Sequence, residues 1–417
     1  MKYSGLKGME DILPPDISIW QTVESTARDI FGRYGFQEVR VPILESTDIF
    51  TRGIGEATDI VEKEMYTFTD KGNRSVTMRP EGTASVVRCF VEKGLHTLSS
   101  PQKFCYSGPM FRYERPQKGR FRQFYQIGAE AFGIAYPSMD AELIIMLKNL
   151  LETIGLSELN FEINSIGCAE CRPAYRQALL DFFSSELAEY CPDCQRRYQT
   201  NPLRILDCKV ERCVALRQGA PAMTDYLCAA CRVHFDEVLS LLNVFKVPYT
   251  LNPNLVRGLD YYTKTTFEVT SEHLGAQKAV AAGGRYDRLV EEFGGPVTPA
   301  IGFAIGMERL VTLLKEKQGI AFPAPKAFIA TLGKEAELEG FRIVETLRAQ
   351  GIWAEQSYGS ASLKSQLRRA DRLGSEFALI IGDNELRAGN VQWKNLKKGE
   401  HGEISVQDIS LLFGLMA

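Results

Sequence analysis

Arginines gather beside aromatic, amide and carboxylate side chains in residues 111–124, a segment centred on Pro116 and Gly119. The segment carries five cations and one carboxylate, and its composition predicts two strands joined by a loop. Because side chains alternate between the two faces of a strand, one face of the second strand should combine cationic, aromatic, amide and carboxylate groups. The residues expected on that face are Arg122, Phe124, Gln126, Gly128 and Glu130.

Such a face suits a nucleotide with a second ligand beside it. Fixed guanidinium groups hold phosphate through paired hydrogen bonds, and an aromatic ring can stack on a base. The alternative is a solvated strand with surface ion pairs, which is the commoner role of a basic hairpin. Phe124, Gln126 and Glu130 share the face of the arginines, and they favour the ligand interpretation without deciding it.

A second group of polar side chains lies in residues 257–262, where an arginine precedes a glycine and two adjacent tyrosines follow. The glycine, Gly258, would let a ligand approach the main chain closely. A strand of small residues, 279–282, then leads into Gly283 and Gly284, which could serve a ligand in the same way. Tight packing of two strands is the alternative for these glycines.

Two further segments could complete such a site. Thr83 follows a predicted strand and stands where a helix begins, so its hydroxyl could cap that helix while Glu81 points into a crevice. The Glu81 carboxylate suits an ammonium group, and a solvated surface carboxylate is the alternative. Near the start of a later helix, Glu308 and Arg309 offer another cation that could face the same cavity.

Eight of the ten cysteines lie in residues 168–235, in pairs separated by two or four residues. Thiols at this spacing suit tetrahedral zinc, and eight ligands would make two four-thiolate structural sites. In a chain this large without an export signal, reduced thiols without metal are the alternative. Cys89 and Cys105 stand alone and are expected in the core. The candidate zinc ligands are Cys168, Cys171, Cys191, Cys194, Cys208, Cys213, Cys228 and Cys231.

Length and composition limit the class of protein. With 417 residues, 45% of them hydrophobic and 24% charged, the chain can form two or three globular domains. Residues 1–11 lack an apolar stretch and no window reaches the length of a membrane span, so we expect a cytoplasmic protein. A net charge of −3 argues against a protein that coats nucleic acid, although local basic patches could still bind RNA.

The pattern of apolar residues predicts mixed helices and strands. Residues 16–34 have helical spacing and stop at Gly35, and residues 36–44 are predicted to form a strand interrupted by Pro42. Strands are predicted at residues 66–79 and 103–132, with helices between them and after Asp140, and strands resume at Tyr249 and run through Val269 and Ala279 to Arg285. Strands and helices thus follow one another without regular alternation, which indicates an α+β fold.

Composition also divides the chain into domains. Residues 1–167 and 236–318 are expected to form one domain, interrupted by a helical, cysteine-rich insertion at residues 168–235. A linker at 318–325 should lead to a small α/β domain at 326–417, whose three short apolar strands, at 328–331, 352–356 and 377–381, are separated by helical segments. Its helix at residues 362–373 carries a row of basic side chains, expected near RNA phosphates or simply solvated. These side chains are Lys364, Arg368, Arg369 and Arg372.

These segments resemble the signatures of class II aminoacyl-tRNA synthetases, and specifically of the histidyl-tRNA synthetase family. Residues 111–124 look like motif 2, residues 306–310 look like motif 3, and residues 19–44 are similar to the dimer-forming motif 1. Residues 257–262 and 282–287 resemble the two histidine signatures, which are more restrictive. The resemblance spans nearly the whole chain. It implies an antiparallel-sheet catalytic domain, the helical insertion, and a C-terminal α/β domain that binds the anticodon.

The resemblance implies a homodimeric histidine-tRNA ligase. Such an enzyme forms histidyl-adenylate and pyrophosphate from L-histidine and ATP, then transfers histidine to the 3' end of tRNA(His). Arg112 and Arg257 would be the catalytic residues, at the α-phosphate and the reacting carboxylate, and Mg²⁺ would bridge the outgoing phosphates. The expected ATP-binding residues are Arg112, Glu114, Arg115, Arg120, Phe124 and Arg309.

The same resemblance implies a pocket for histidine. Acceptor groups would bind its α-amino group, and a ring with two nitrogens needs hydrogen-bond partners at both ends. The residues expected at the α-amino group are Glu81, Thr83 and Gln126. The residues expected to read the imidazole are Glu130, Tyr262 and Tyr286. The rest of the histidine site is expected to comprise Arg257, Tyr261, Gly283 and Gly284.

Two other classes of protein share part of these features. A synthetase-like regulatory subunit of histidine biosynthesis keeps the catalytic fold without charging tRNA. Such subunits typically lack parts of the histidine signatures and the C-terminal domain, and this chain has both. A zinc-dependent nucleic-acid-binding module would explain the cysteines, but it would leave the groups around Arg112 and Arg257 unexplained.

Overall fold

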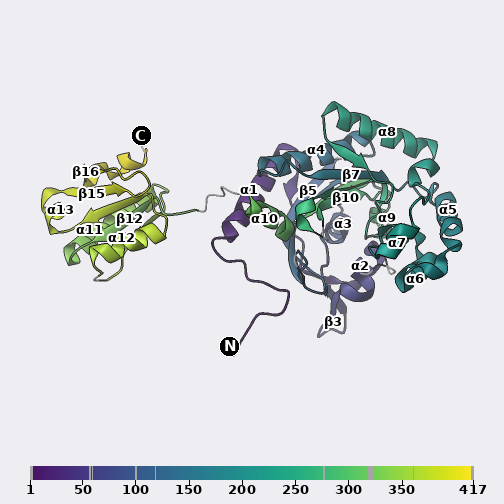
Figure 1. Cartoon of the computed structure of the whole chain (residues 1–417), viewed down its shortest axis with the longest axis horizontal. Helices are drawn as coiled ribbons and strands as arrows, with labels where there is room; N and C mark the ends of the chain where they lie inside the picture. The colour runs from purple at the N-terminus through teal and green to yellow at the C-terminus, as the bar shows by residue number, and fades with distance from the viewer. Residues whose placement is uncertain are drawn as a thin grey trace. The chain divides into compact units, whose positions relative to one another are not determined.

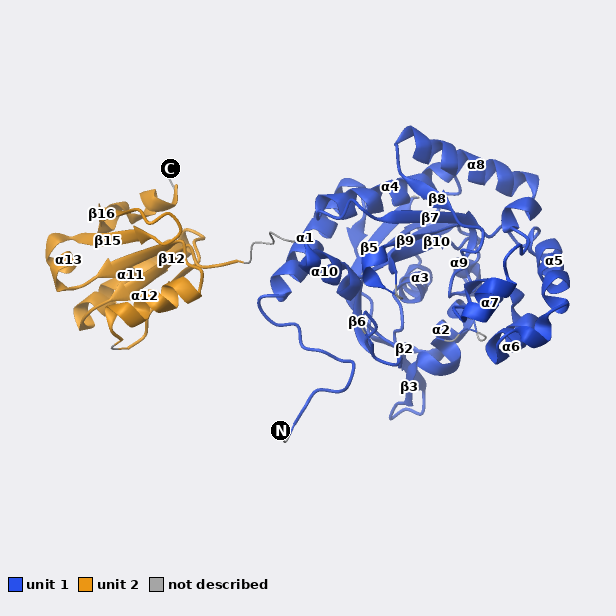
Figure 2. Ribbon diagram, in the orientation of Figure 1, with its two compact units in different colours: residues 1–320 blue, residues 321–417 orange. Residues whose placement is uncertain are grey.

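The computed structural model describes residues 3–55, 58, 60–98, 101–117, 119–275, 278–317, 323–359 and 361–414. The chain divides into two units, residues 1–320 and 321–417 (Figure 2). Each unit has its own sheet and its own buried hydrophobic cluster. Part of the expected linker, residues 318–322, lies outside the described residues.

An eight-stranded sheet forms the centre of the first unit (Figure 1). Its inner strands pair antiparallel, whereas the outermost pairs, β1 with β5 and β7 with β8, are parallel. This arrangement confirms the α+β class predicted from the sequence. In spatial order the strands are β1 (Gln37–Glu38), β5 (Gln102–Phe111), β6 (Gln123–Phe132), β11 (Ala300–Gly306), β10 (Ala279–Arg285), β9 (Thr263–Thr270), β7 (Asn160–Ser165) and β8 (Tyr249–Leu251).

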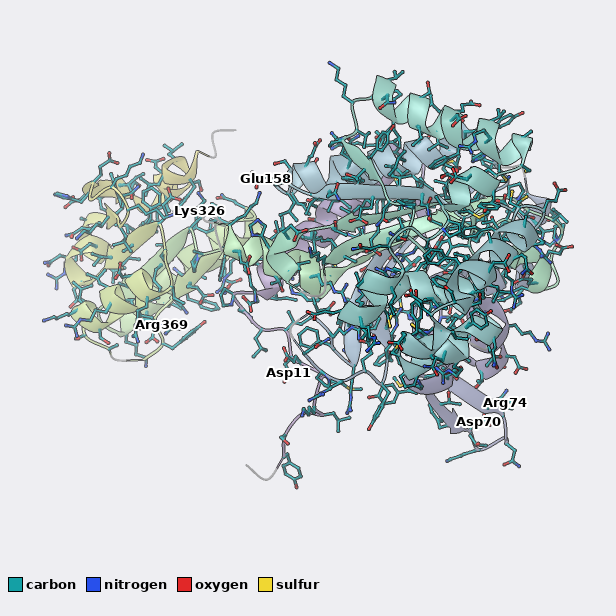
Figure 3. All side chains as sticks on the ribbon, turned by 45° about the vertical axis from the view of Figure 1, so that its right-hand side comes forward. Asp11, Asp70, Arg74, Glu158, Lys326 and Arg369 are labelled. Atoms are coloured by element: carbon teal, nitrogen blue, oxygen red, sulfur yellow. The ribbon has the colours of Figure 1, made fainter. Side chains whose placement is uncertain are left out.

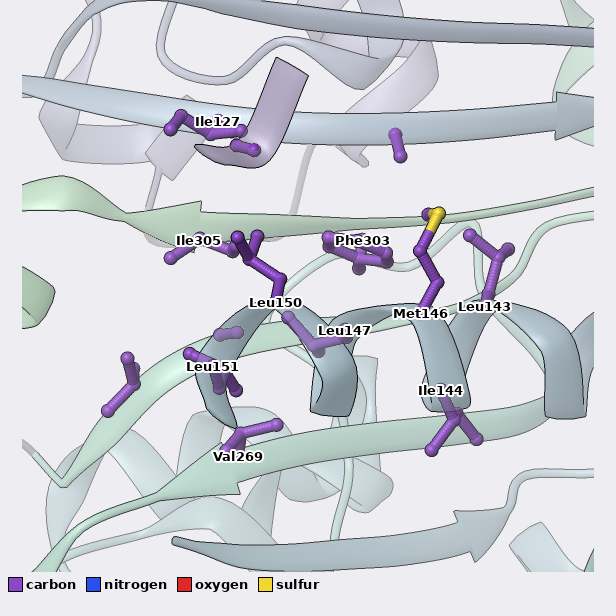
Figure 4. Packing of buried hydrophobic residues seen from close by; sticks show 14 of the residues in the cluster. Ile127, Leu143, Ile144, Met146, Leu147, Leu150, Leu151, Val269, Phe303 and Ile305 are labelled. Carbon is purple, nitrogen blue, oxygen red and sulfur yellow. The ribbon is translucent and has the colours of Figure 1, made fainter. Parts of the chain in front are cut away.

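Helices cover one face of this sheet and bury the largest hydrophobic cluster of the chain. Figure 4 shows Leu147 and Leu150 of α4 beside Phe303 and Ile305 of β11. Because strand side chains alternate in direction, Gln126 and Glu130 of β6 point to the opposite face from Ile127 and Ala129. The helices that contribute to this cluster are α1 (Ile17–Arg33), α4 (Pro137–Thr153), α8 (Ala229–Val244) and α10 (Met307–Glu316).

The first helix and the strands that follow it agree with the sequence pattern. Helix α1 confirms the prediction for residues 16–34, and Gly35 follows it with a φ of 81°. The strand predicted at residues 36–44 is interrupted at Pro42 as expected, and it consists of two short strands, β1 and β2 (Leu44–Ser46), on either side of that proline. Proline has no N–H to donate to a ladder, and here it separates the two strands.

The first unit also contains a separate, three-stranded sheet. Strand β2 pairs with β4 (Ser75–Met78), which pairs with β3 (Tyr66–Thr69). The hairpin between β3 and β4 is closed by Asp70 and Arg74, 2.7 Å apart, labelled in Figure 3. Helix α2 (Thr47–Ile54) contacts β2 and β4, and it packs in turn against α3 (Thr83–Glu92) and α9 (Leu289–Glu292).

Two strands of the large sheet are absent from the predictions, and one predicted stretch is not a strand. Strands β7 and β11 were not expected, although β11 lies at the centre of the sheet. Conversely, residues 252–262 form a loop between β8 and β9, where extended structure was expected from Tyr249 onward. This loop contains the arginine and tyrosines of the first histidine signature.

Residues 168–235 are mainly helical, as predicted, and they bury a hydrophobic cluster of their own that includes cysteines. Helix α8 continues past residue 235 and returns the chain to the large sheet. The elements of the insertion before α8 are α5 (Arg172–Ser184), η3 (Leu187–Glu189), α6 (Pro192–Thr200), η4 (Pro202–Asp207), α7 (Glu211–Leu216) and η5 (Met223–Tyr226).

The second unit contains the three strands that were predicted and two that were not. Its sheet has the order β13, β12, β14, β15, β16, and the first three strands are parallel. Helix α12 confirms the basic helix, with Lys364, Arg368 and Arg372 exposed at intervals of four residues. Arg369, labelled in Figure 3, lies over the Phe328 and Tyr358 rings. The elements are β12 (Ala327–Thr331), α11 (Lys334–Ala349), β13 (Ala354–Gln356), α12 (Leu363–Arg372), β14 (Phe377–Ile381), α13 (Asp383–Ala388), β15 (Asn390–Asn395), β16 (His401–Ser405) and η7 (Val406–Phe413).

Across the described residues of both units, none of the helices combines the length and the apolar character needed to cross a membrane.

Candidate active site

A cleft on the sheet face opposite α4 holds most of the predicted site residues. Its empty volume is about 930 Å³, including the open mouth. Strands β10 and β11 supply small side chains beneath it, and we call residues 279–282, Ala304 and Gly306 the floor. The polar and charged residues on its walls are Glu81, Thr83, Arg112, Glu114, Arg120, Gln126, Arg257, Tyr261, Tyr262, Glu268, Glu308 and Arg309.

The hairpin between β5 and β6 fixes its arginines through contacts within the protein. Arg112, directly after β5, donates from Nε to the Pro80 carbonyl at 2.9 Å. Its guanidinium carbon lies 5.1 Å from the centre of the Phe124 ring. The Nε atom of Arg120 lies 2.9 Å from an oxygen of Glu114. These guanidinium groups are therefore positioned before any ligand binds, which lowers the entropic cost of binding a phosphate.

Helix α10 brings a third cation to the cleft. Arg309, in its first turn, donates from Nε to the Gly119 carbonyl at 3.0 Å and from Nη1 to the Ala279 carbonyl at 2.7 Å. It therefore ties the hairpin loop to the floor. The neighbouring Glu308 accepts a hydrogen bond from the Tyr125 amide at 2.8 Å. Burial raises the pKa of Glu308 to about 7.

The loop between β8 and β9 brings Arg257 to the cleft from a separate part of the chain. Its Nη1 atom lies 2.7 Å from Oε2 of Glu268 on β9, and its guanidinium carbon lies 5.7 Å from the centre of the Tyr262 ring. Among the described residues, the Nε atom of Arg257 is buried and has no hydrogen-bond partner. This N–H is available to a ligand.

The start of α3 corrects the expectation for Thr83. Its hydroxyl does not cap the helix, because Thr83 is already the first helical residue and donates to Oε1 of Glu130 at 2.6 Å. Glu81 takes the capping role instead, accepting from the amides of Thr83 and Ala84 at 2.6 and 2.8 Å. Burial raises the pKa of Glu81, while these amides oppose the change. The carboxylate also lines the cleft, so one face can receive a ligand cation.

Glu130 lies behind the wall of the cleft and does not line it. Its side chain is fully buried and accepts hydrogen bonds from the hydroxyls of Thr83, Tyr286 and Tyr106, at 2.6, 2.5 and 3.4 Å. Burial raises the pKa of Glu130 to about 8 despite the hydroxyls. The Glu130 carboxyl thus orients Thr83, which does line the cleft. With this pKa, Glu130 gains or loses its proton near neutral pH.

Three polar atoms in the cleft residues lack a partner among the described residues. They are Oε1 of Gln126, the Tyr261 hydroxyl and Nε of Arg257, and all three are buried. Buried polar groups are normally hydrogen-bonded, because leaving one unpaired costs about 1–3 kcal/mol. An acceptor, a hydroxyl and a cationic donor left free in one cleft indicate a site built for a polar ligand.

A family profile described as "Histidyl-tRNA synthetase" matches residues 8–310. The chain belongs to the histidyl-tRNA synthetase family. A second profile, described as "Anticodon binding domain", matches residues 326–411, almost the whole of the second unit. Both matches agree with the resemblance of the sequence motifs.

Relatives and solved structures agree with this membership. The histidine–tRNA ligase of Trichlorobacter lovleyi is 52% identical over 407 residues, covering 98% of this chain and 97% of that protein. The histidine–tRNA ligase of Syntrophotalea carbinolica is 51% identical over 409 residues, with the same coverage. The crystal structure of apo S. aureus histidyl-tRNA synthetase superposes with a TM-score of 0.82 at 38% identity and covers 99% of each chain.

A structure described as an ATP phosphoribosyltransferase regulatory subunit/histidyl-tRNA synthetase from Bacillus halodurans shares the fold alone. It has a TM-score of 0.67 at 19% identity and covers 92% of this chain. The fold by itself therefore does not separate the synthetases of this family from the regulatory alternative.

Five of the residues expected in the histidyl-tRNA synthetase site do not line the cleft. Besides Glu130, these are Tyr286, which is buried behind it, and Arg115, which is exposed on the hairpin. Gly283 and Gly284 serve strand packing, because an added Cβ would lie 2.3 Å from the Gly302 carbonyl or 2.7 Å from that of Thr265. These distances support the alternative of tight strand packing for this glycine pair, and the expected approach of a ligand to their main chain stays a prediction. Lys118 of the hairpin lies outside the described residues.

Sequence reasoning missed Glu268 and Tyr106. Glu268 is a cleft carboxylate that stands between the buried Phe267 and Val269, and a charge in an apolar strand was the available signal. The Tyr106 ring fills the space beside two glycines, since a Cβ on either Gly82 or Gly128 would lie 2.2 Å from it. No pattern in the sequence marked that contact.

A buried ion pair between Arg285 and Asp140 connects the second histidine signature, residues 282–287, to helix α4. Arg285 has no exposed surface and donates from Nε to Asp140 of α4 at 3.0 Å. The same carboxylate contacts Nε2 of His234 on α8, at 2.8 Å. Arg285 therefore connects the strand of the signature to two helices, and it does not face the cleft.

The eight cysteines of the insertion form two groups that could hold a metal ion. One contains Cys168, Cys171, Cys228 and Cys231, and the sulfurs within each group lie within 4.8 Å of one another. The prediction of two four-sulfur groups is supported by this geometry, and the prediction that Cys105 lies in the core is confirmed. The other group contains Cys191, Cys194, Cys208 and Cys213.

Proposed function

We infer that this chain ligates histidine to tRNA in two steps. It forms histidyl-adenylate and pyrophosphate from L-histidine and ATP, then transfers histidine to the 3' end of tRNA(His). One observation carries the inference. Arg112, Arg257 and Arg309 come from three separate segments and meet around one cleft, which is also lined by Glu81 and by Gln126 with its unpaired oxygen. This combination of charges matches a triphosphate next to an ammonium group.

In the first step, an already ionised carboxylate attacks the α-phosphorus, so positioning and charge neutralisation matter more than a general base. We propose that Arg112 holds the α-phosphate and the histidine carboxylate together. Arg257 would stabilise the charge that develops there through its free Nε–H. Arg309 would brace the polyphosphate from the other side of the cleft.

The hairpin supports a nucleotide site. Phe124 lines the cleft beside Arg112 and would stack on adenine, while Glu114 and Arg120 would contact the ATP as a fixed ion pair. Arg115, exposed on the same hairpin, would reach the phosphates as they bind.

Mg²⁺ is expected to arrive with ATP. This ion commonly binds through one or two carboxylates plus substrate phosphates, and Glu114 and Glu308 line the cleft. When bound, it would neutralise the outgoing pyrophosphate.

The histidine end of the cleft combines acceptors with hydroxyls. Glu81, Thr83 and Gln126 would bind the α-amino group, because all three line the cleft and Gln126 has a free oxygen. Tyr261 and Tyr262 would contact the imidazole. Glu130 and Tyr286 would act through the hydroxyl network behind the wall. A pocket of this kind rejects an apolar side chain of similar size, which would leave its buried polar groups unpaired.

The partners and location follow from the same proposal. The second unit would bind the tRNA anticodon, with the exposed basic row of α12 near RNA phosphates. A homodimer would form through the motif 1 segment, where Ile43 and Leu44 are 40% and 48% exposed. We place the enzyme in the cytoplasm. The two cysteine groups would hold structural zinc, outside the reaction itself.

Aminoacylation tests the function directly. The purified chain, supplied with ATP, Mg²⁺ and bulk tRNA, should charge tRNA with histidine and with none of the other amino acids. Histidine-dependent exchange between ATP and pyrophosphate should appear without tRNA. A protein that binds histidine but shows neither activity would be a regulatory subunit, and the proposal would be wrong.

A further inference from the structure

Side chains of the insertion donate hydrogen bonds to both ends of the segment of residues 257–262, although the insertion residues and this segment lie far apart in the sequence. Arg204 of η4 donates from Nη1 to the main-chain carbonyl of Arg257 at 2.8 Å. Arg172, at the start of α5, donates to the main-chain carbonyl of Tyr262. Asn201 donates to the Asp260 carboxylate at 3.1 Å. The segment is a loop without ladder hydrogen bonds of its own. The contacts from the insertion hold its two ends, and between them the Asp260 amide donates to the Ile54 carbonyl at 3.0 Å.

The two arginines, Arg172 and Arg204, lie close in the sequence to members of the cysteine groups. Cys171 directly precedes Arg172, which is the first residue of α5. Cys208 closes η4, the short helix that contains Arg204, and its amide donates to the Ile205 carbonyl at 3.1 Å. One cysteine group therefore fixes Arg172 and the other fixes Arg204.

The geometry of the sulfurs suits tetrahedral zinc. A Zn–S distance of about 2.3 Å places the sulfurs of a tetrahedron about 3.8 Å apart. The recorded separations are 3.6 Å for Cys168 and Cys171, 3.9 Å for Cys168 and Cys228, and 3.9 Å for Cys191 and Cys208. A disulfide would need sulfurs at about 2.05 Å, and all ten cysteines are free.

Main-chain amides point at the sulfurs in both groups. The Cys228 amide donates to the sulfur of Cys171 at 3.1 Å, and the Cys191 amide donates to that of Cys213 at 3.3 Å. Such bonds stabilise a thiolate and orient it as a metal ligand. The two groups do not follow one another along the chain. The group from Cys191 to Cys213 lies in the sequence between the two cysteine pairs of the other group, Cys168 with Cys171 and Cys228 with Cys231. One ion therefore closes the ends of the insertion and the other closes its middle.

We propose that each cysteine group binds one Zn²⁺, and that the two ions hold Arg172 and Arg204 as positioning residues for the 257–262 segment. Through Arg257 and Tyr262, metal occupancy of the insertion then sets the geometry of the cleft. The ions take no part in the chemistry. This inference rests on the proposed function for its kinetic part, and its metal part is independent of that function.

Metal content tests the first half. The full chain, purified without chelator, should contain two zinc ions, both released when a mercurial titrates the thiols of the folded protein. Cys171→Ser and Cys208→Ser should each lower the content to about one. Less than one zinc per wild-type chain would overturn the metal sites. The mercurial titration gives the answer even where a serine variant fails to fold.

Arg204→Ala tests the second half, with Arg204→Lys and Arg212→Ala beside it. Displacing a catalytic group by about 1 Å can cost about 100-fold in rate, so we expect kcat for pyrophosphate exchange to fall by up to that factor while zinc content stays at two. Lysine should restore part of the rate, because it can still donate to the carbonyl. Arg212 is an exposed arginine of the same insertion, and its replacement should change nothing.

Amide hydrogen exchange separates positioning from general damage. Residues 255–263 should exchange faster in Arg204→Ala and in chelator-treated wild type, while the large sheet keeps its protection. Unchanged exchange in this segment together with an unchanged kcat in Arg204→Ala would overturn the positioning role. If the wild type lacked histidine-dependent activity, the proposed function would fail, and zinc content and hydrogen exchange would still decide this inference.

Discussion

Replacement of Arg257 by alanine is the sharpest test of the site. The guanidinium group is divided between two tasks, since Nη1 pairs with Glu268 and Nε is buried and free. Removing one fixed donor from developing charge in a water-excluded site costs about 10²- to 10³-fold in kcat, or about 2.7–4 kcal/mol. We therefore expect Arg257→Ala to lower the rate of histidyl-adenylate formation by that factor while histidine binding changes little.

The Glu268 carboxylate complicates this variant, because alanine leaves it uncompensated in the cleft wall. An unpaired carboxylate would repel the phosphates and could produce a rate loss of its own. The double variant Arg257→Ala/Glu268→Ala removes both charges. If the arginine acts on the reacting phosphate, the double variant stays as slow as the single one, whereas relief of repulsion would restore the rate.

Two measurements distinguish the outcomes. Single-turnover formation of adenylate reports the chemical step, and calorimetric titration with histidine reports binding. Arg257→Lys keeps the charge but cannot reach Glu268 and a phosphate at once, so it should fall between alanine and wild type. Near-normal pyrophosphate exchange in Arg257→Ala would refute the assigned role.

Three further outcomes follow from the buried groups around the cleft. The pKa of Glu130 is raised by burial to about 8 from an ordinary value of 4.5, so the folded state holds a proton that the unfolded state releases, and stability falls as pH rises between these values. Glu130→Gln should abolish that decline, at most about 1.4 kcal/mol per pH unit, in urea unfolding at pH 5 to 8; an unchanged slope would contradict the assignment. Gly302→Ala should lower the free energy of unfolding by about 1–3 kcal/mol or more, because its Cβ would lie 1.5 Å from Oε2 of Glu130. Histidine binding should be lost with it, and a variant of wild-type stability would show that this wall can move. Asp140→Asn should cost up to about 3–5 kcal/mol in thermal or urea unfolding, because the fully buried Arg285 loses the carboxylate bound to its Nε and keeps only Asp287, 3.1 Å from Nη1; a loss below 1 kcal/mol would mean that Asp287 alone compensates the cation.

The sequence predicted elements whose signals are local. Helix α1 and the parallel strands of the second unit have uninterrupted apolar patterns, and they were predicted close to their observed bounds. Strand β11 was missed because its residues, 300–306, alternate glycine and alanine with larger apolar side chains. Its place at the centre of the sheet is decided by pairing with β6 and β10, which no local pattern contains.

The candidate site shows the same division. The arginines of the cleft were singled out by type and spacing, but a solvated strand explained a basic hairpin as well, and their roles in one site came from the resemblance to the synthetase family. The roles of Glu81 and Thr83 were exchanged, since the capping oxygen depends on where the helix begins, which a shift of one residue decides. The position of Glu130 behind the wall depends on the depth of the sheet, and the sequence gives only which face it lies on.

The floor of the cleft limits how its selectivity could change. Apart from Val280, the floor consists of alanines and a glycine on β10 and β11, so most substitutions there add volume. An evolving or engineered pocket can therefore readily become shallower from below but gains little depth there. Room for a bulkier amino acid would have to come mainly from the sides, by shortening residues such as Leu259 or Tyr262. The floor therefore limits the size of the side chain that the pocket accepts.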